Sequence, residues 1–251
     1  MSKQFRVLLA GETWMSYGIH IKGFGAYTTG SYEEGLAPLA DAVNGWCELV
    51  HLPNHLAAHE FPGSLEALQA YDVILLSDIP SDTILLHPDT IFHSKVKPNR
   101  LRLIQSYVEA GGGFGMIGGY MSFSGFEGKA NYRNTHIAKV LPVVMGAGDD
   151  RIESPEGIRP TVTDSSHPIL KGIGGEWPVL LGYNRFTAKP EADVVLEYED
   201  DPFLVTGSFG SGRVAAYASD CSPHWGSPDF VNWQYYKTFW RQFIAWLAGE
   251  T

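Results

Sequence analysis

The chain of 251 residues contains 44% hydrophobic and 18% charged residues and carries a formal net charge of -10. This composition is typical of a folded protein that buries a large core, and we expect one domain spanning residues 1–251. The acidic balance, without a block of Lys or Arg, argues against nucleic acid or an anionic membrane as a partner, because either would need a basic face. A membrane span is not expected, since no run of about 18 apolar residues occurs.

The two cysteines, Cys47 and Cys221, lie far apart in the sequence. Two are too few for a disulfide framework, so we expect reduced thiols and a cytoplasmic location. They form neither a Cys-x-x-Cys pair nor a Cys/His cluster. We therefore expect no metal site and no cofactor.

The first half of the sequence alternates short apolar runs with segments of helical periodicity. Strands are predicted at residues 5–10, 47–52, 72–77 and 114–117, and helices at residues 32–44 and 99–110. Apolar strands separated by helices indicate a parallel sheet that is covered on both faces. The proline-bearing segment of residues 81–98 is predicted to be irregular, either as a surface excursion or as a lid.

The second half of the sequence contains strand candidates with short connections. They lie at residues 179–181, 192–198, 203–209 and 213–219, with a tight turn at residues 210–212. We expect antiparallel strands that extend the sheet without forming a separate domain. Residues 230–248 place six large apolar side chains on one face, which predicts an amphipathic helix that closes the structure.

A glycine pair, Gly118 and Gly119, follows the predicted strand at residues 114–117. In α/β hydrolytic and amidotransferase folds, such a corner presents a Ser or Cys nucleophile. Open N–H groups at this corner would form an anion or carbonyl pocket, whereas the simpler interpretation is that glycine only permits a tight turn. Ser122 and Ser124 are nearby hydroxyls, but they lack the Gly-x-Ser-x-Gly context, and capping is their expected role.

Polar and aromatic residues follow several of the predicted strands. Glu12 and Trp14 come after the first strand, Asp78 after the third, and Tyr120 after the glycine corner. The carboxyl ends of parallel strands share one edge, so these side chains should face a common crevice. Carboxylates beside an aromatic ring can hold a sugar or polyol, although a hydrophobic plug with helix caps would place the same residues there.

The segment after residue 219 contains Asp220, Cys221, His224 and Trp225, and of these Asp220, His224 and Trp225 are expected to line the same crevice. A His beside an Asp at this edge can act as a base or bind a polar ligand; alternatively it caps or packs under the aromatic helix. Cys221 is expected to be an inert thiol, because the neighbouring carboxylate disfavours a thiolate.

Several motifs together resemble the class I glutamine amidotransferase-like proteins, in particular a family of uncharacterised putative glutamine amidotransferases, and more distantly the ThuA-like group. The segments that carry the resemblance are residues 71–78, 111–125, 141–143, 149–153, 167–172, 182–184, 210–214 and 220–225. The resemblance implies a flavodoxin-like, doubly wound, mostly parallel sheet with added antiparallel strands. A working glutaminase of this class has a Gly-x-Cys-x-Gly elbow and a later His-Pro-Glu.

The resemblance places Gly118 where the nucleophilic Cys belongs. His224 stands near the histidine position, but Trp225 and Gly226 replace the Pro-Glu. Glutamine hydrolysis needs a thiolate, so the chain is expected to lack glutaminase activity and to bind a small polar ligand, plausibly carbohydrate-derived. Two alternatives stay open. One is a hydrolase or isomerase that uses His224 with Asp220 or Glu12 as acid and base, and the other is a non-catalytic structural or regulatory subunit that offers the aromatic helix at residues 230–248 to a partner. A homo-oligomer is a further expectation.

Overall fold

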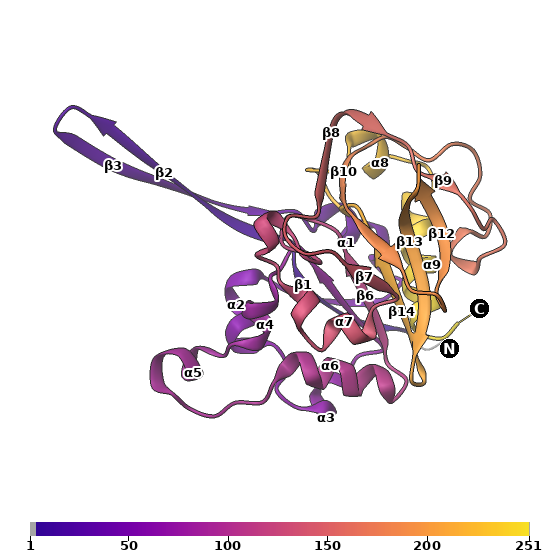
Figure 1. The fold of residues 1–251 in the computed structure, drawn as a ribbon, viewed down its shortest axis with the longest axis horizontal. Coiled ribbons are helices and arrows are strands. Elements are labelled where there is room, and N and C mark those ends of the chain that lie inside the picture. The colour runs from indigo at the N-terminus through magenta and orange to yellow at the C-terminus, as the bar shows by residue number, and fades with distance from the viewer. Residues whose placement is uncertain (1–3, 251) are drawn as a thin grey trace.

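The computed structural model describes residues 4–250, and its centre is an eight-stranded sheet (Figure 1). Five strands run parallel, and in sheet order they are β4 (Glu48–Leu52), β1 (Arg6–Gly11), β5 (Val73–Ser77), β6 (Gly113–Ile117) and β14 (Gly212–Tyr217). Three antiparallel strands extend this sheet: β13 (Asp201–Phe209), β12 (Asp193–Tyr198) and β9 (Thr161–Val162).

The parallel strands follow the flavodoxin order. Counted along the chain, their spatial sequence is second, first, third, fourth, fifth, so the strand order reverses between β1 and β5. This confirms the predicted doubly wound fold. In such sheets a ligand crevice lies outside the carboxyl ends of the strands at the reversal point.

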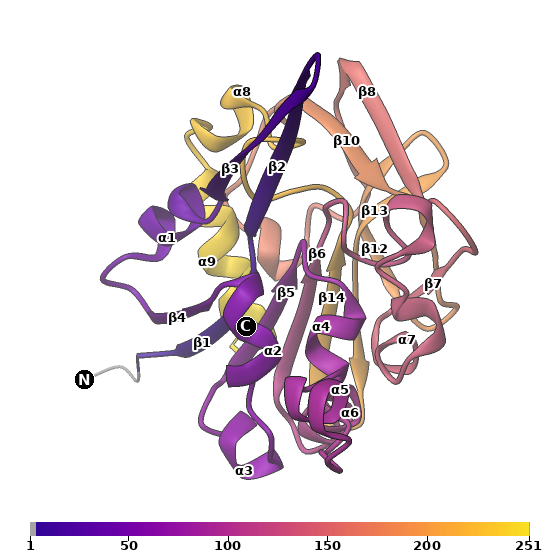
Figure 2. The ribbon, with the colours of Figure 1, turned by 90° about the vertical axis from the view of Figure 1, so that its left-hand side faces the viewer.

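Helices cover both faces of the parallel strands. In chain order they are α1 (Ala37–Val43), α2 (Asn54–Glu60), α3 (Leu65–Leu68), α4 (Ser81–Leu85), α5 (Pro88–His93), α6 (Arg100–Glu109), α7 (Ile137–Val140), α8 (Pro228–Val231) and α9 (Tyr236–Leu247). Figure 2 shows α1 and α9 on one side and α4, α6 and α7 on the other. Within residues 4–250, no helix combines the length and apolarity that a membrane crossing requires.

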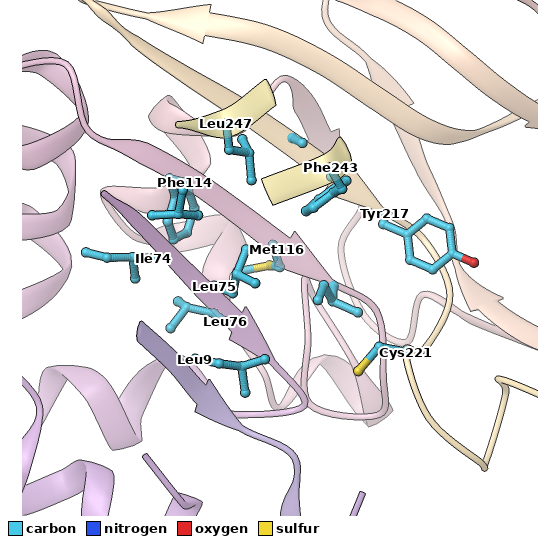
Figure 3. Packing of buried hydrophobic residues seen from close by; sticks show 14 of the residues in the cluster. Leu9, Ile74, Leu75, Leu76, Phe114, Met116, Tyr217, Cys221, Phe243 and Leu247 are labelled. Carbon is cyan, nitrogen blue, oxygen red and sulfur yellow. The ribbon is translucent and has the colours of Figure 1, made fainter. Parts of the chain in front are cut away.

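Helix α9 lies unusually close to β6, and glycine makes this approach possible. A Cβ atom on Gly113 would lie 2.4 Å from the carbonyl oxygen of Leu247, and one on Gly115 would lie 3.1 Å from Phe243. Figure 3 shows Phe243 and Leu247 packed over the central strands. The glycines within this strand therefore serve helix–sheet packing, which is a common reason for glycine inside a strand.

A long β-hairpin after β1 was not predicted. Strands β2 (Thr13–Lys22) and β3 (Gly25–Glu34) pair with each other and project far from the body (Figure 1). The predicted helix at residues 32–44 is therefore wrong over its first residues, because residues 32–34 belong to β3 and α1 begins at Ala37.

Three other predictions need correction. The segment 81–98 is not wholly irregular, because it contains α4 and α5. Residues 179–181 do not extend the main sheet: β10 (Leu180–Asn184) pairs with β8 (Arg151–Ile158) in a separate sheet, as β11 (Phe186–Ala188) does with β7 (Val143–Met145). The predicted helix 230–248 is split into α8 and α9.

Candidate functional site

A cavity of about 560 Å³ opens at the carboxyl ends of the parallel strands. It is lined by Glu12, Trp14, Asp78, Tyr120, Met121, Phe126, Asp220 and His224. Glu12 directly follows β1 and Asp78 directly follows β5, the two strands between which the sheet order reverses. Six of the predicted site residues thus meet in one cavity, of a size suited to a small molecule.

Glu12 is buried, and both of its carboxyl oxygens have hydrogen-bond partners. Oε1 accepts the hydroxyl hydrogen of Ser77, and Oε2 accepts that of Ser222 at 3.1 Å. Burial, and then the charges of Asp220 and Asp78, raise the pKa of Glu12 well above its ordinary value. Glu12 is therefore a carboxyl group that retains its proton at pH values where a free Glu is ionised.

Asp78 is held by the chain segment that leaves β6. Its Oδ1 accepts a hydrogen bond from the backbone N–H of Met121 at 2.7 Å, and its own N–H donates to Ser122 Oγ at 3.0 Å. Burial, reinforced by the charge of Asp220, raises the pKa of Asp78 to about 6.

Glu12 and Asp78 share an uncommon backbone conformation. Their φ angles are 55° and 45°, in the left-handed region that non-glycine residues rarely occupy. Such a conformation costs about 1–3 kcal/mol and tends to occur at functional sites. Here it marks the two strand ends that carry carboxyl groups into the cavity.

His224 and Asp220, from the segment after β14, also line the cavity. His224 Nδ1 lies 3.8 Å from Asp220 Oδ2, and the His224 ring makes an edge contact with Tyr120 at a centroid distance of 4.5 Å. Burial lowers the pKa of His224, but Asp220, Glu153 and Asp78 outweigh this effect and raise the pKa overall. The imidazole therefore holds its proton more tightly than a free His does.

The aromatic rings of Tyr120 and Phe126, which line the cavity, contact the guanidinium group of Arg151. The Arg151 guanidinium carbon lies 4.3 Å from the centroid of the Tyr120 ring and 4.0 Å from that of Phe126. Trp225 is fully buried, stacks on His224 at 5.3 Å and donates its indole N–H to Glu153 at 3.1 Å. Trp225, which was predicted to bind ligand, therefore lies behind the cavity and supports the ring of His224.

The glycine corner after β6 is closed by backbone contacts. The N–H of Gly118 donates to the carbonyl oxygens of Tyr217 at 2.9 Å and Ser219 at 3.0 Å, and the N–H of Gly119 donates to Asn184 Oδ1 at 2.9 Å. These amides are not the open donors that an anion pocket would need. The tight-turn interpretation describes this corner.

Neither glycine of the corner leaves room for a side chain. A Cβ atom on Gly118 would lie 2.0 Å from the carbonyl oxygen of Ala218, and one on Gly119 would lie 2.9 Å from the Asp78 side chain. Gly119 also has a φ angle of 152°. The backbone itself therefore excludes a nucleophilic side chain at either position.

The family model described as "Putative glutamine amidotransferase" matches residues 6–249. The chain belongs to this family. The cytoplasmic protein STM3548 from Salmonella typhimurium is 44% identical, with a TM-score of 0.93 over 96% of this chain and 98% of that one. The cytoplasmic protein STM1381 from Salmonella typhimurium LT2 is 45% identical, with a TM-score of 0.92 over the same shares of the two chains.

More distant structures share only the fold. A putative ThuA-like protein from Bacteroides uniformis is 15% identical, with a TM-score of 0.53 over 97% of this chain and 92% of that one. The comparison with curated proteins gave no match. The predicted family resemblance, including the distant likeness to a ThuA-like protein, is thus confirmed.

This family member places no reactive sulfur in its cavity among residues 4–250. Cys221 is completely buried and is not one of the lining residues. Burial, together with Glu12 and Asp220, raises the pKa of its thiol well above the ordinary value. The inert thiol expected from the sequence stays a prediction, which the burial and the raised pKa of Cys221 support.

The serines near the corner have structural partners. Ser122 Oγ donates to the carbonyl oxygen of Ile117 at 2.6 Å, and Ser124 Oγ donates to that of Gly146 at 2.6 Å. Both side chains are buried. They tie the chain after β6 to its surroundings and lie outside the cavity lining.

One group of three potential metal ligands occurs within residues 4–250. The ligand atoms of Glu12, Asp220 and Cys221 lie within 4.8 Å of one another. Both oxygens of Glu12 already accept serine hydroxyl groups, and Cys221 is held as a thiol. In this structure the three groups form part of a hydrogen-bonded carboxyl cluster.

Sequence reasoning missed the residues that support the cavity from the second half of the chain. Asn184 Nδ2 donates to Asp150 Oδ1 at 2.8 Å, and Asp150 accepts the N–H groups of Ser124 and Gly125, both at 2.8 Å. Met121 and Phe126 also line the cavity without having been predicted. The sequence could have indicated these two residues, because both follow the glycine corner at the end of β6 within ten residues.

Proposed function

We propose that this protein binds a small, neutral, polyhydroxylated ligand in the cavity at the strand ends and does not hydrolyse glutamine. The single observation that carries this proposal is the composition of the cavity, in which aromatic rings face carboxyl groups and an imidazole without a thiol. Flat rings pack on the apolar face of a sugar, while carboxyl groups and imidazole bond its hydroxyls. A carbohydrate or a derivative of one fits this combination.

The charge of the lining residues restricts the ligand further. The residues that line the cavity include three acids and one His, and neither Lys nor Arg is among those described. A phosphate or carboxylate ligand would face repulsion from Asp78 and Asp220. A neutral polyol avoids this cost and still uses each carboxyl group as a hydrogen-bond partner.

The proposed lack of glutaminase activity rests on the lack of a reactive thiol at the cavity. Hydrolysis of glutamine in this class proceeds through a thiolate nucleophile. The corner after β6 has no space for a Cys, and Cys221 is buried with a raised pKa. The fold of the family is therefore kept without the group that would attack the amide.

An acid–base enzyme is the second candidate, favoured by the pairing of Glu12 with Asp220. Two neighbouring carboxyl groups, here with oxygen atoms within 4.8 Å of each other, of which one has a strongly raised pKa, are the usual arrangement for a proton donor beside a proton acceptor. His224 at the cavity wall would then exchange protons with the ligand, oriented by Asp220. A hydrolase or isomerase acting on a sugar would combine both candidates.

The non-catalytic subunit suggested by the C-terminal helix receives less support. The aromatic face of α9, with Phe239, Trp240 and Phe243, is completely buried in the core. This face is thus not available to a partner. A cytoplasmic location is proposed because two relatives of similar length are described as cytoplasmic proteins.

A thermal-shift screen tests the binding proposal. The panel contains neutral sugars and polyols, the matching sugar phosphates and sugar acids, and glutamine. We expect stabilisation by a neutral member and none by its anionic counterpart, since a ligand that binds only the folded state raises the melting temperature. Stabilisation by the anionic forms alone would contradict the proposal.

A cavity variant identifies where the ligand binds. Trp14 is 40% exposed, so Trp14→Ala should leave the melting temperature of the free protein nearly unchanged but reduce the ligand-induced shift. Ile91→Ala is the matched control, because Ile91 is 56% exposed on α5 and does not line the cavity. An equal ligand-induced shift in wild type and Trp14→Ala would place the ligand elsewhere.

A further inference from the structure

The cavity at the strand ends has a buried polar end and an open aromatic end. The polar end contains the carboxyl groups of Glu12 and Asp220, which are 1% and 4% exposed. The open end contains Trp14, at the foot of the projecting hairpin, and the half-buried ring of Phe126 (Figure 1). A ligand that fills the cavity therefore extends from polar groups to apolar rings.

Two polar atoms of the cavity are free to bond a ligand. Asp78 uses Oδ1 to accept the N–H of Met121, and His224 turns Nδ1 toward Asp220. Within residues 4–250, Asp78 Oδ2 and His224 Nε2 have no hydrogen-bond partner. A sugar fits these two atoms, because each of its hydroxyl groups can both donate and accept a hydrogen bond.

A row of aromatic rings leads from His224 toward the open end of the cavity. The Tyr120 ring contacts the His224 ring at a centroid distance of 4.5 Å and stacks with the Phe126 ring at 6.0 Å, with 19° between the two planes. The Arg151 guanidinium group contacts both rings and restricts their motion. Tyr120 and Phe126 thus form a preformed flat wall.

The part of the lining around Phe126 is apolar. The segment after β6 contributes Tyr120, Met121 and Phe126 to the cavity, and the two cations that contact the Phe126 ring, Lys129 and Arg151, are not among the described lining residues. A second sugar ring at this end would leave hydroxyl groups without partners, which costs free energy. An apolar group would instead remove the exposed ring surface from water.

The volume of the cavity also exceeds the needs of one sugar ring. Its 560 Å³ falls within the range of about 300–1,000 Å³ that is typical of pockets for drug-sized ligands. A single sugar ring is smaller than such ligands. A sugar held by Asp78 and His224 would therefore leave the aromatic end unfilled.

We propose that the ligand is a glycoside with a flat apolar substituent, whose sugar bonds Asp78 and His224 and whose substituent lies along Tyr120 and Phe126. This inference rests on the function proposed above and adds to it the chemical class of the second part of the ligand. The sugar hydroxyls exchange hydrogen bonds with water and gain little on binding. The substituent supplies most of the affinity, because it buries apolar surface.

Isothermal titration calorimetry with matched ligands tests this proposal. The ligands are the methyl and phenyl glycosides of glucose, galactose and mannose, a disaccharide of each sugar, and benzyl alcohol as the apolar group without a sugar. We expect a phenyl glycoside to bind at least about 10-fold more tightly than the methyl glycoside of the same sugar. The disaccharide should show no comparable gain.

Two substitutions separate the two parts of the ligand. Phe126→Ala should reduce the phenyl-to-methyl affinity ratio to within about 2-fold, and Phe126→Leu, which keeps apolar bulk beside Tyr120, should reduce it less. Asp78→Asn should weaken both glycosides by a similar factor, because it acts on the sugar. Phe92→Ala is the control that should leave the ratio unchanged, since Phe92 is 74% exposed on α5 and does not line the cavity.

The outcomes distinguish this inference from the proposed function. Equal affinity for the methyl and phenyl glycosides, a disaccharide that binds as tightly as the phenyl glycoside, or a ratio that survives Phe126→Ala and Phe126→Leu would overturn the apolar substituent and leave sugar binding intact. Benzyl alcohol that binds as tightly as the phenyl glycoside would overturn the proposed sugar binding. A protein that binds none of these ligands would contradict both.

Discussion

The ends of β1 and β5 differ from the end of β6, although all three lie at the same edge of the sheet. At the end of β6, Gly118 and Gly119 have bonded amides and no space for a side chain. At the ends of β1 and β5, Glu12 and Asp78 occupy left-handed conformations and carry carboxyl groups with raised pKa values into the cavity.

This difference supports the proposal that the ends of β1 and β5, and not the end of β6, carry the functional groups of this chain. The elbow that carries the nucleophile in related enzymes serves here as a packing corner between β6 and β14. The groups able to bind or to exchange protons are those at the strand-order reversal and on the segment after β14. Function in this member should therefore respond to changes at Glu12, Asp78 and His224, while changes at Gly118 should act on folding.

The largest effect is expected from a side chain at the corner. Gly118→Cys places a Cβ atom 2.0 Å from the Ala218 carbonyl oxygen, so the free energy of unfolding should fall by about 3 kcal/mol. Urea denaturation measures this loss, and an assay for ammonia release from glutamine should stay negative.

Gly146→Ala is the matched control for this substitution. A Cβ atom at Gly146 would have no heavy atom within 4 Å, and we expect a change within about 0.5 kcal/mol. A Gly118→Cys protein as stable as the wild type would show that the corner does have space for the nucleophile.

A smaller effect on stability, which depends on pH, is expected from Asp78 at the end of β5. The pKa of Asp78 is about 6 in the folded state, above the ordinary value of 3.8. Between these values the folded state holds a proton that the unfolded state has lost, so stability falls as pH rises through this range. Asp78→Asn removes this cost and should stabilise the protein by about 2 kcal/mol near pH 7 and by almost nothing near pH 4.

Asp149→Asn is a control in which the pH dependence of stability has the opposite sign. Hydrogen bonds from Arg151 lower the pKa of Asp149, so its contribution to stability is present above the unfolded pKa and is lost in acid. Urea denaturation at several pH values measures both variants. An Asp78→Asn protein that is less stable than the wild type at neutral pH would disprove the raised pKa.

The smallest effect is expected on the pKa of His224, whose imidazole lines the cavity. The His224 pKa should lie above the ordinary value of 6.5 in an NMR titration, and Asp220→Asn should lower it, because burial then acts without its main opposing charge. The stabilisation by protonated His224 is complete below the unfolded pKa and is lost as pH rises through the folded pKa. An unchanged pKa in Asp220→Asn would show that the 3.8 Å contact has no electrostatic consequence.

The parallel sheet and its ligand edge could be predicted because they depend on local signals. Apolar runs such as residues 73–77 define buried strands, and parallel strands bring Glu12, Asp78 and His224 to one edge by topology alone. The closure of the corner could not be predicted, since it depends on how closely Ala218 of the chain after β14 approaches Gly118. The Asn184–Asp150 contact likewise joins residues 34 positions apart.

The hairpin of β2 and β3 has a strand pattern in its sequence that the prediction overlooked. Met15, Tyr17, Ile19 and Ile21 alternate with Ser16, Gly18 and His20, which is the period of a strand. The Gly23–Phe24 turn with φ of 59° at Gly23 then reverses the chain. The predicted helix at residues 32–44 overlapped the last three residues of the second strand, 32–34.

The most direct test of the central claim is intact-mass measurement after incubation with a diazoketone analogue of glutamine, which alkylates a reactive thiolate. We expect an unmodified protein, because Cys221 is buried as a thiol and Gly118 has no side chain. A single covalent adduct located at Cys221 would contradict it and would show that this cavity retains a nucleophile.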